Sequence, residues 1–186
     1  MNDIIRDVEQ ARANAILIHD EAAVQEALQK MADGINARFS GTNPLVICVM
    51  NGGMIPAGWL LPKLSFSFEF DYLHATRYRG KTIGSELQWI SKPHMSLKDR
   101  DVLLIDDILD EGTTLASIID FCLQQGAASV CSAVLVRKLH DRGVTDLEVD
   151  FCGLEVEDRY VFGCGMDYRN YLRNLPAIYG LAEEDE

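Results

Sequence analysis

The sequence predicts an α/β fold in which a mainly parallel sheet lies between layers of helices. Two short runs, LVICVM at 45–50 and DVLLID at 101–106, are almost entirely apolar, which is typical of central strands covered on both faces. An amphipathic helical pattern at 113–126 follows the second run. Strands that alternate with helices in this way indicate crossover connections and a parallel sheet. The length of 186 residues suits one domain with a substantial core.

The first part of the chain predicts a long helix before the first of these strands. Asp20 is a typical helix N-cap, and the apolar residues after it recur at helical spacing. The Asn43-Pro44 pair then breaks the chain. After the first strand, NGG at 51–53 predicts a tight turn and MIPAGWLLPKL at 54–64 predicts a further helix. The apolar face of the long helix consists of Val24, Ala27, Leu28, Met31 and Ile35.

The remaining elements complete the sheet and add a small lobe. FSFEFDYLHAT at 66–76 alternates, which predicts a half-buried strand with its aromatic residues on the apolar face. RYRGKTIGSEL at 77–87 is basic and contains glycines, so it predicts a loop, and QWIS at 88–91 predicts a returning strand. SVCSAVLVRK at 129–138 predicts another strand. From about residue 150, short strands and many turns predict a second, smaller lobe formed together with the N-terminal helix.

Composition and charge limit the partners that we expect. The net charge of −12 repels nucleic acid and anionic membranes, but it does not exclude a phosphorylated small substrate. Apolar runs fall short of the roughly 18 residues of a membrane helix. The N-terminal MNDIIRDVEQ lacks the pattern of a signal peptide. The five cysteines are scattered, as is typical of buried, reduced thiols, so we expect a cytoplasmic protein.

Four carboxylates within six positions follow the strand at 101–106, and they are the main functional signal. They belong to Asp106, Asp107, Asp110 and Glu111. Ligands of parallel sheets bind beyond the carboxyl ends of the strands, and the N-terminus of the next helix is a phosphate site. Gly112 allows close approach of an anion, and Thr113 and Thr114 add hydroxyl donors. Because carboxylates accept hydrogen bonds from sugar hydroxyls and hold the waters of Mg²⁺, the pattern predicts a sugar-phosphate site.

An alternative interpretation is that these acids only cap the helix that follows. Asp110 by itself is well explained as a cap. Four crowded carboxylates repel one another, however, unless something cationic or hydrogen-donating binds among them. We therefore favour the ligand site.

VLLIDDILDEGTT at 102–114 resembles the phosphoribosyl-pyrophosphate motif of the purine and pyrimidine phosphoribosyltransferases. The resemblance runs from about residue 20 to 180 and is strongest to the hypoxanthine-guanine phosphoribosyltransferases, particularly their bacterial forms. VMNGG at 49–53 resembles the pyrophosphate-binding loop of that family, and LVRK at 135–138 resembles its purine-reading strand. DRYVFGCGMDYRNYLRNL at 158–175 resembles its C-terminal hood segment.

The resemblance implies a type I phosphoribosyltransferase fold and a purine-salvage reaction. The whole chain, 1–186, would form one domain, with a core at about 42–148 and a hood from about 1–41 and 149–186. The reaction would transfer a 5-phosphoribosyl group from phosphoribosyl pyrophosphate to hypoxanthine or guanine, giving IMP or GMP and pyrophosphate. It would require Mg²⁺. A homodimer or homotetramer is also implied.

The resemblance also assigns a role to each matching residue. Asp110 would be the general base at the purine N7, and Lys138, Tyr160 and Val161 would bind the purine through its exocyclic oxygen, its ring face and its edge. The other roles concern phosphoribosyl pyrophosphate and the metal. The ribose and 5′-phosphate would be bound by Asp106, Asp107, Glu111, Gly112, Thr113 and Thr114; pyrophosphate by Asn51, Gly52, Gly53 and Arg173; and the metal by Asp167, Asp106 and Asp107, partly through water.

Two positions depart from the family pattern. Arg77-Tyr78, at the start of the basic loop, stands where the family has a Ser-Tyr pair in a lid, and lids of this kind exclude water from the reaction. Asn51 stands where many members carry a lysine, so a hydrogen-bond donor remains but a positive charge is lost.

Two alternatives remain open at this stage. One is a phosphoribosyltransferase for another base, namely xanthine, adenine or uracil; Lys138 and the hood segment argue against adenine and uracil. The other is a non-catalytic regulator that senses phosphoribosyl pyrophosphate and binds nucleic acid, and the net charge of −12 argues against it.

Overall fold

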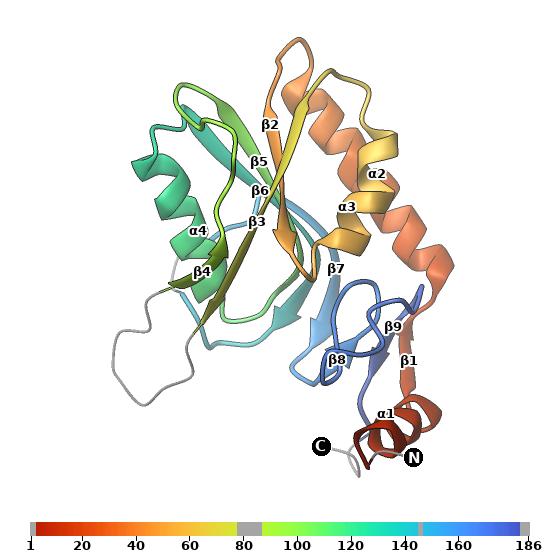
Figure 1. Cartoon of the computed structure of the whole chain (residues 1–186). Coiled ribbons are helices and arrows are strands. Elements are labelled where there is room, and N and C mark those ends of the chain that lie inside the picture. Colours follow the sequence, from red (N-terminus) through yellow and green to blue (C-terminus); the bar gives the residue numbers. More distant parts are fainter. Residues whose placement is uncertain (1–2, 78–86, 145–146, 183–186) are drawn as a thin grey trace.

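The computed structural model describes residues 3–77, 87–144 and 147–182 and contains two sheets (Figure 1). The large sheet has six strands in the order β4-β3-β2-β5-β6-β7, and the small one has three in the order β1-β9-β8. The strands of the large sheet are β2 (Leu45–Met50), β3 (Glu69–Arg77), β4 (Leu87–Ser91), β5 (Asp101–Leu109), β6 (Ser129–Leu139) and β7 (Phe151–Glu157). Neighbouring strands run parallel, except that β4 is antiparallel to β3. The predicted α/β fold with a mainly parallel sheet is therefore confirmed.

The strand order reverses next to β2, and this reversal determines where a ligand can bind. After β2, the chain adds β3 on one side and later adds β5 on the other side. The connections that leave these two central strands therefore diverge, which leaves a crevice beyond their carboxyl ends. The turn at 51–53 follows β2, and the acidic cluster lies at the end of β5, so both predicted site segments border the same crevice.

Helices cover the large sheet on both faces, as Figure 1 shows. The helices α2 (Glu21–Phe39) and α3 (Met54–Leu60) pack on one face, and α4 (Thr113–Gln124) packs on the other. A short 3₁₀ helix, Leu61–Lys63, follows α3. Successive side chains of β2 point to opposite faces of the sheet. Val46 and Cys48 belong to the core with α2, whereas Ile47 and Val49 belong to the core with α4.

Local signals placed the helix ends correctly. The Asp20 side chain caps α2, since the amide N–H of Ala23 donates to Asp20 Oδ1 over 2.8 Å. The sequence pattern for α4 ends at Gly126. This residue has a φ of 89°, a conformation that glycine adopts at little cost and that ends the helix.

The predicted orientation of the strand at 66–76 is wrong. The strand begins only at Glu69, and Phe70 and Tyr72 on the expected apolar face are 47% and 40% exposed. The opposite face is buried, with Asp71 at 7% and Leu73 at 0%. Burial of Asp71 is compensated by hydrogen bonds, because its carboxylate accepts from the amides that follow β4. The alternation of aromatic and polar residues predicted the strand correctly. It did not show which face of the strand α4 covers.

The small sheet joins both ends of the chain. Its strands are β1 (Ile16–His19), β8 (Val161–Phe162) and β9 (Ile178–Gly180), and α1 (Asp3–Ala13) packs beside them. The boundary between the two parts differs from the expected one, because α2 packs on the large sheet as well as on the hood, and β7 is a strand of the large sheet. Within the described ranges, no helix combines the length and the apolar character that crossing a membrane requires.

Candidate active site

Two neighbouring aspartates lie at the carboxyl end of β5, with their side chains mostly buried against each other. The amide of Asp107 donates to Asp106 Oδ1 over 2.9 Å. Burial, together with the negative charge of Asp107, raises the pKa of Asp106 well above its usual value. Burial also raises the pKa of Asp107, although the positive charge of Arg173 opposes that rise. Such a pair favours a shared proton, a cation or hydroxyl donors between its oxygens.

The turn after β2 packs so closely on this pair that only glycine fits. A Cβ atom on Gly52 would lie 1.9 Å from Asp107 Oδ2, and one on Gly53 would lie 2.6 Å from backbone oxygens of β2 and β5. The peptide bond before Asn51 is cis. The hood loop that follows β8 reaches the same turn, because a Cβ on Gly165 would lie 2.0 Å from the carbonyl oxygen of Gly52. The predicted pyrophosphate turn therefore contacts both the acidic strand end and the hood.

The predicted phosphate turn leads directly into α4. Gly112 has a φ of 73° and precedes Thr113, the first residue of the helix. The first N–H groups of an α-helix have no partner within the helix, so this end presents donors to an anion. The segment after β6 packs on the turn, because the Val144 amide donates to the Glu111 carbonyl over 2.9 Å. A Cβ on Gly143 would lie 2.5 Å from that same carbonyl oxygen.

A pocket lies between the ends of β5 and β6 and the hood. Its lining combines the residues for which we predicted contact with a purine base and one aspartate of the acidic pair. The lining residues are Asp107, Ile108, Asp110, Lys138, Tyr160, Val161, Met166 and Asp167. Segments far apart in the sequence thus meet at one place.

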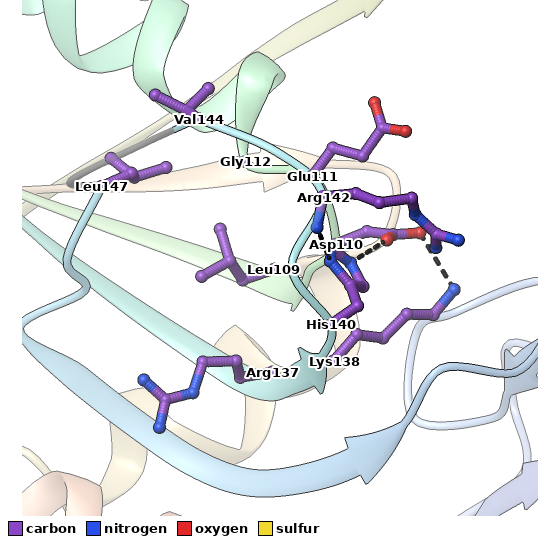
Figure 2. A pocket seen from close by; sticks show the side chains of 10 residues that line it. All are labelled: Leu109, Asp110, Glu111, Gly112, Arg137, Lys138, His140, Arg142, Val144 and Leu147. Carbon is purple, nitrogen blue, oxygen red and sulfur yellow. Dashed lines mark hydrogen bonds and ion pairs between the residues drawn. The ribbon is translucent and has the colours of Figure 1, made fainter.

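Asp110 lines this pocket and also a second, adjacent pocket. Its carboxylate lies between two nitrogen donors (Figure 2). Lys138 Nζ lies 2.9 Å from Asp110 Oδ2, and His140 Nε2 lies 2.8 Å from Asp110 Oδ1. Burial alone would raise the pKa of Asp110, but the hydrogen bonds and positive charge of these partners outweigh it and lower that pKa. Asp110 is therefore held as a carboxylate.

On the hood side of the pocket, Arg173 pairs with Asp167. Arg173 Nη2 lies 2.7 Å from Asp167 Oδ1, and Nη1 donates to the Gly165 carbonyl over 2.6 Å. The hydroxyl of Tyr160 donates to the Asp167 carbonyl over 3.0 Å, while the Tyr160 side chain remains 43% exposed. Arg173 and Asp167, which we expected to bind pyrophosphate and metal, are therefore paired with each other.

The second pocket contains residues that the sequence did not single out for this site (Figure 2). It is lined by Leu109, Asp110, Glu111, Gly112, Arg137, Lys138, His140, Arg142, Val144 and Leu147. The sequence predicted no role for His140. His140 lies just beyond the last residue of β6, so its place beside Asp110 depends on the path of the segment after that strand.

One group of described residues brings potential metal ligands together. Asp110, His140 and Asp158 each offer a ligand atom, and these atoms lie within 4.8 Å of one another. Two cationic groups already pair with the acids of this group, namely Lys138 with Asp110 and Arg142 with Asp158 at 2.6 Å. We therefore interpret it as an ion-pair network. Of the expected lid residues, Arg77 ends β3, and Tyr78 lies outside the described residues.

Comparisons with known proteins agree with this geometry. Residues 17–169 match the phosphoribosyl transferase domain family. The hypoxanthine-guanine-xanthine phosphoribosyltransferase of Tritrichomonas foetus is 29% identical over 168 residues, which cover 90% of this chain and 91% of that protein. The hypoxanthine-guanine phosphoribosyltransferase of Streptococcus pneumoniae is 31% identical over 170 residues, covering 91% of this chain and 93% of that protein.

A solved structure also resembles the whole chain. The crystal structure of a hypoxanthine phosphoribosyltransferase from Staphylococcus aureus superposes with a TM-score of 0.87 at 27% sequence identity. The match covers 99% of this chain and 97% of that one. The fold, the strand-end acids and the family match lead to the same conclusion. The chain belongs to the phosphoribosyltransferase family.

Proposed function

We propose that the protein transfers a 5-phosphoribosyl group from phosphoribosyl pyrophosphate to hypoxanthine or guanine, giving IMP or GMP and pyrophosphate. The observation that carries the proposal is the pocket in which Lys138, Asp110 and Tyr160 meet beside Asp107. The named activities of the relatives from T. foetus and S. pneumoniae support the same reaction.

The purine would bind between the hood and the ends of β5 and β6. Tyr160 is 43% exposed and lines the pocket, so a base would stack on its ring, and the backbone of Val161, which lines the same pocket, would contact the edge of the base. Lys138 would donate to the exocyclic oxygen at C6, a group that adenine lacks. A buried ammonium without its acceptor is unfavourable, so this contact selects oxopurines.

Asp110 would act as general base at N7 of the purine. As N9 forms its bond to the anomeric carbon, the carbon–oxygen bond to pyrophosphate breaks and its electron pair leaves with the pyrophosphate. The proton on N7 passes to Asp110. The lowered pKa of Asp110 means that the carboxylate is ionised before the base arrives, although the same shift makes it a weaker proton acceptor.

The remaining site residues would bind phosphoribosyl pyrophosphate. Asp106 and Asp107 would accept hydrogen bonds from the ribose hydroxyls, and the backbone of the turn at 111–114 would bind the 5′-phosphate. The pyrophosphate would contact the turn at 51–53 and Arg173. Asn51 would donate hydrogen bonds there without the charge of a lysine, and the side chains of Thr113 and Thr114 would supplement Glu111 and Gly112.

Mg²⁺ fits the residues present. Oxygen ligands are the ones that Mg²⁺ prefers, and Asp106 and Asp107 form a mostly buried pair of carboxyl groups whose pKa values burial raises, so a cation beside them would be stabilising. These two side chains, partly through water, and Asp167 would hold the metal. When bound, Mg²⁺ would neutralise charge on the pyrophosphate oxygens.

We also propose that the protein forms a homodimer or homotetramer in the cytoplasm. Phe70, Tyr72 and Ile90 are large apolar residues of β3 and β4, and each is at least 40% exposed, as expected of a surface that another subunit covers. The five cysteines are free thiols, which fits a reducing compartment. Light scattering after gel filtration would measure the mass, and a monomer at micromolar concentration would contradict the oligomer.

The reaction is tested by incubating the protein with phosphoribosyl pyrophosphate, Mg²⁺ and one base at a time, with release of pyrophosphate as the measurement. We expect turnover with hypoxanthine and guanine and none with adenine or uracil. Xanthine is included because the T. foetus relative is named for it. Absence of turnover with every base, together with tight binding of RNA, would instead indicate the nucleic-acid-binding regulator.

A further inference from the structure

His140 approaches Asp110 from the side away from the proposed purine pocket. Asp110 and Lys138 line both pockets, whereas His140 lines only the second one (Figure 2). The His140 side chain is 6% exposed, and its Nε2 lies 2.8 Å from Asp110 Oδ1. His140 is thus a buried neighbour of the proposed general base that does not itself face the purine.

The backbone determines which nitrogen of His140 carries the proton. The amide N–H of Arg142 donates to His140 Nδ1 over 3.2 Å. A nitrogen that accepts a hydrogen bond carries no hydrogen of its own, so in the neutral ring the hydrogen is on Nε2. His140 Nε2 therefore donates to Asp110 Oδ1.

The two carboxylate oxygens of Asp110 have different partners, and only one of these partners is proposed to contact the purine. Lys138, on Oδ2, also lines the purine pocket and is the residue proposed to contact the base. When Lys138 donates to the purine, Oδ2 is the oxygen that becomes available to N7. The bond from His140 to Oδ1 can persist throughout, because both its donor and the backbone that orients it lie outside the purine pocket.

We propose that His140 is a positioning residue, which fixes the Asp110 carboxylate through Oδ1 so that Oδ2 faces N7 of the incoming purine. This inference rests on the proposed function. It assigns no proton transfer to His140 itself. Misplacement of a catalytic group by about 1 Å can lower a rate by about 100-fold, so a fixed orientation of Asp110 matters for the chemical step. His140 lines the second pocket together with Glu111 and Gly112, but its hydrogen bond goes to Asp110 and not to the turn proposed for the 5′-phosphate, so we expect the affinity for phosphoribosyl pyrophosphate to change little.

A matched pair of substitutions tests the role. His140→Gln keeps an N–H donor on a side chain of similar reach, whereas His140→Met has similar size and no donor. We expect His140→Met to lower the single-turnover rate of nucleotide formation by about 10- to 100-fold. We expect the KM for phosphoribosyl pyrophosphate to stay unchanged, and His140→Gln to recover most of the rate.

His94 provides the control, since it forms another histidine–aspartate pair outside the site. His94 Nδ1 lies 3.5 Å from Asp71 Oδ1, next to the end of β4. We expect His94→Met to leave the single-turnover rate unchanged. Thermal unfolding of each variant identifies any loss of the fold, and His140→Gln against wild type remains informative if His140→Met does not fold.

The outcomes separate this inference from the proposed function. If the wild-type protein turns over no purine, the proposed function fails, and the inference fails with it. If the wild type is active and folded His140→Met reacts at the wild-type rate, only the inference is overturned. Equal losses in His140→Met and His140→Gln would also overturn it, because the donated hydrogen bond would then be irrelevant.

Discussion

Replacing Asp106 by asparagine is expected to stabilise the ligand-free protein while removing its activity. Asp106 and Asp107 are mostly buried against each other, and burial with the neighbouring charge raises the pKa of Asp106. Two unit charges about 4 Å apart repel by about 4 kcal/mol at an effective dielectric constant of about 20. The raised pKa of Asp106 reflects this repulsion together with its burial. Asparagine removes the charge and keeps an oxygen acceptor for the Asp107 amide.

We expect the free energy of unfolding to rise by about 1 to 2 kcal/mol at pH 8 without Mg²⁺, or about 2 to 8 °C in Tm for a chain of this size. The sign of the pH dependence follows from the raised pKa. The folded wild type binds more protons than the unfolded chain above the ordinary pKa of aspartate, so its stability falls as the pH rises through the raised pKa. Asp106→Asn should lose this slope, and its advantage should shrink toward pH 5.

The measurement is thermal unfolding between pH 5 and pH 8 in a chelating buffer. Asp101→Asn is the matched control, because Asp101 lies at the other end of β5 and accepts a hydrogen bond from the Ser129 hydroxyl. It should leave the pH dependence of stability unchanged. The reasoning would be refuted if Asp106→Asn were less stable than the wild type at pH 8, or if it kept the wild-type pH slope.

Three further substitutions test the site. Asp110→Asn should lower the turnover number by about 10²- to 10⁴-fold while binding of phosphoribosyl pyrophosphate, followed by calorimetry, survives; an unchanged rate would remove Asp110 from the role of base. Lys138→Met should lower kcat/KM for hypoxanthine by about 1.5 to 3 kcal/mol, or about 10- to 150-fold. It should also move the acidic limb of the pH–rate profile to higher pH, because the lysine helps to keep the pKa of Asp110 low; a fixed limb would contradict this. Gly52→Ala would place a Cβ 1.9 Å from Asp107 Oδ2 and should weaken binding of inorganic pyrophosphate at least tenfold, whereas Gly58→Ala on α3, where a Cβ has open space, should bind it normally.

Much of the fold was predictable because its signals are local. The strand, turn and helix around Gly112 follow from an apolar run, an αL glycine and an amphipathic helix, each contained within a few residues. The N-cap of α2 is equally local, since Asp20 and its partner Ala23 are three residues apart. Neighbouring residues alone determine these features, whatever the position of the rest of the chain.

Features that depend on tertiary packing were missed. The buried face of β3 was assigned wrongly because the position of α4, not the alternation, decides whether Asp71 or Tyr72 is covered. The strand β7 was expected in the hood because pairing with β6 cannot be read from its own residues. The position of His140 beside Asp110 depends on the path of the segment after β6. The two residues are 30 positions apart in the sequence.

The contact between Gly165 and the Gly52 carbonyl couples two loops that are more than a hundred residues apart in the sequence. A side chain at position 165 would collide with the Gly52 carbonyl, and one at position 52 would collide with the Asp107 carboxylate. The hood loop, the turn after β2 and the acidic strand end therefore form a single fitted unit. Exchanging one of them for a bulkier loop in an engineered chimera would therefore separate the hood from the acidic strand end. Designers who alter base preference through the hood should exchange both segments together.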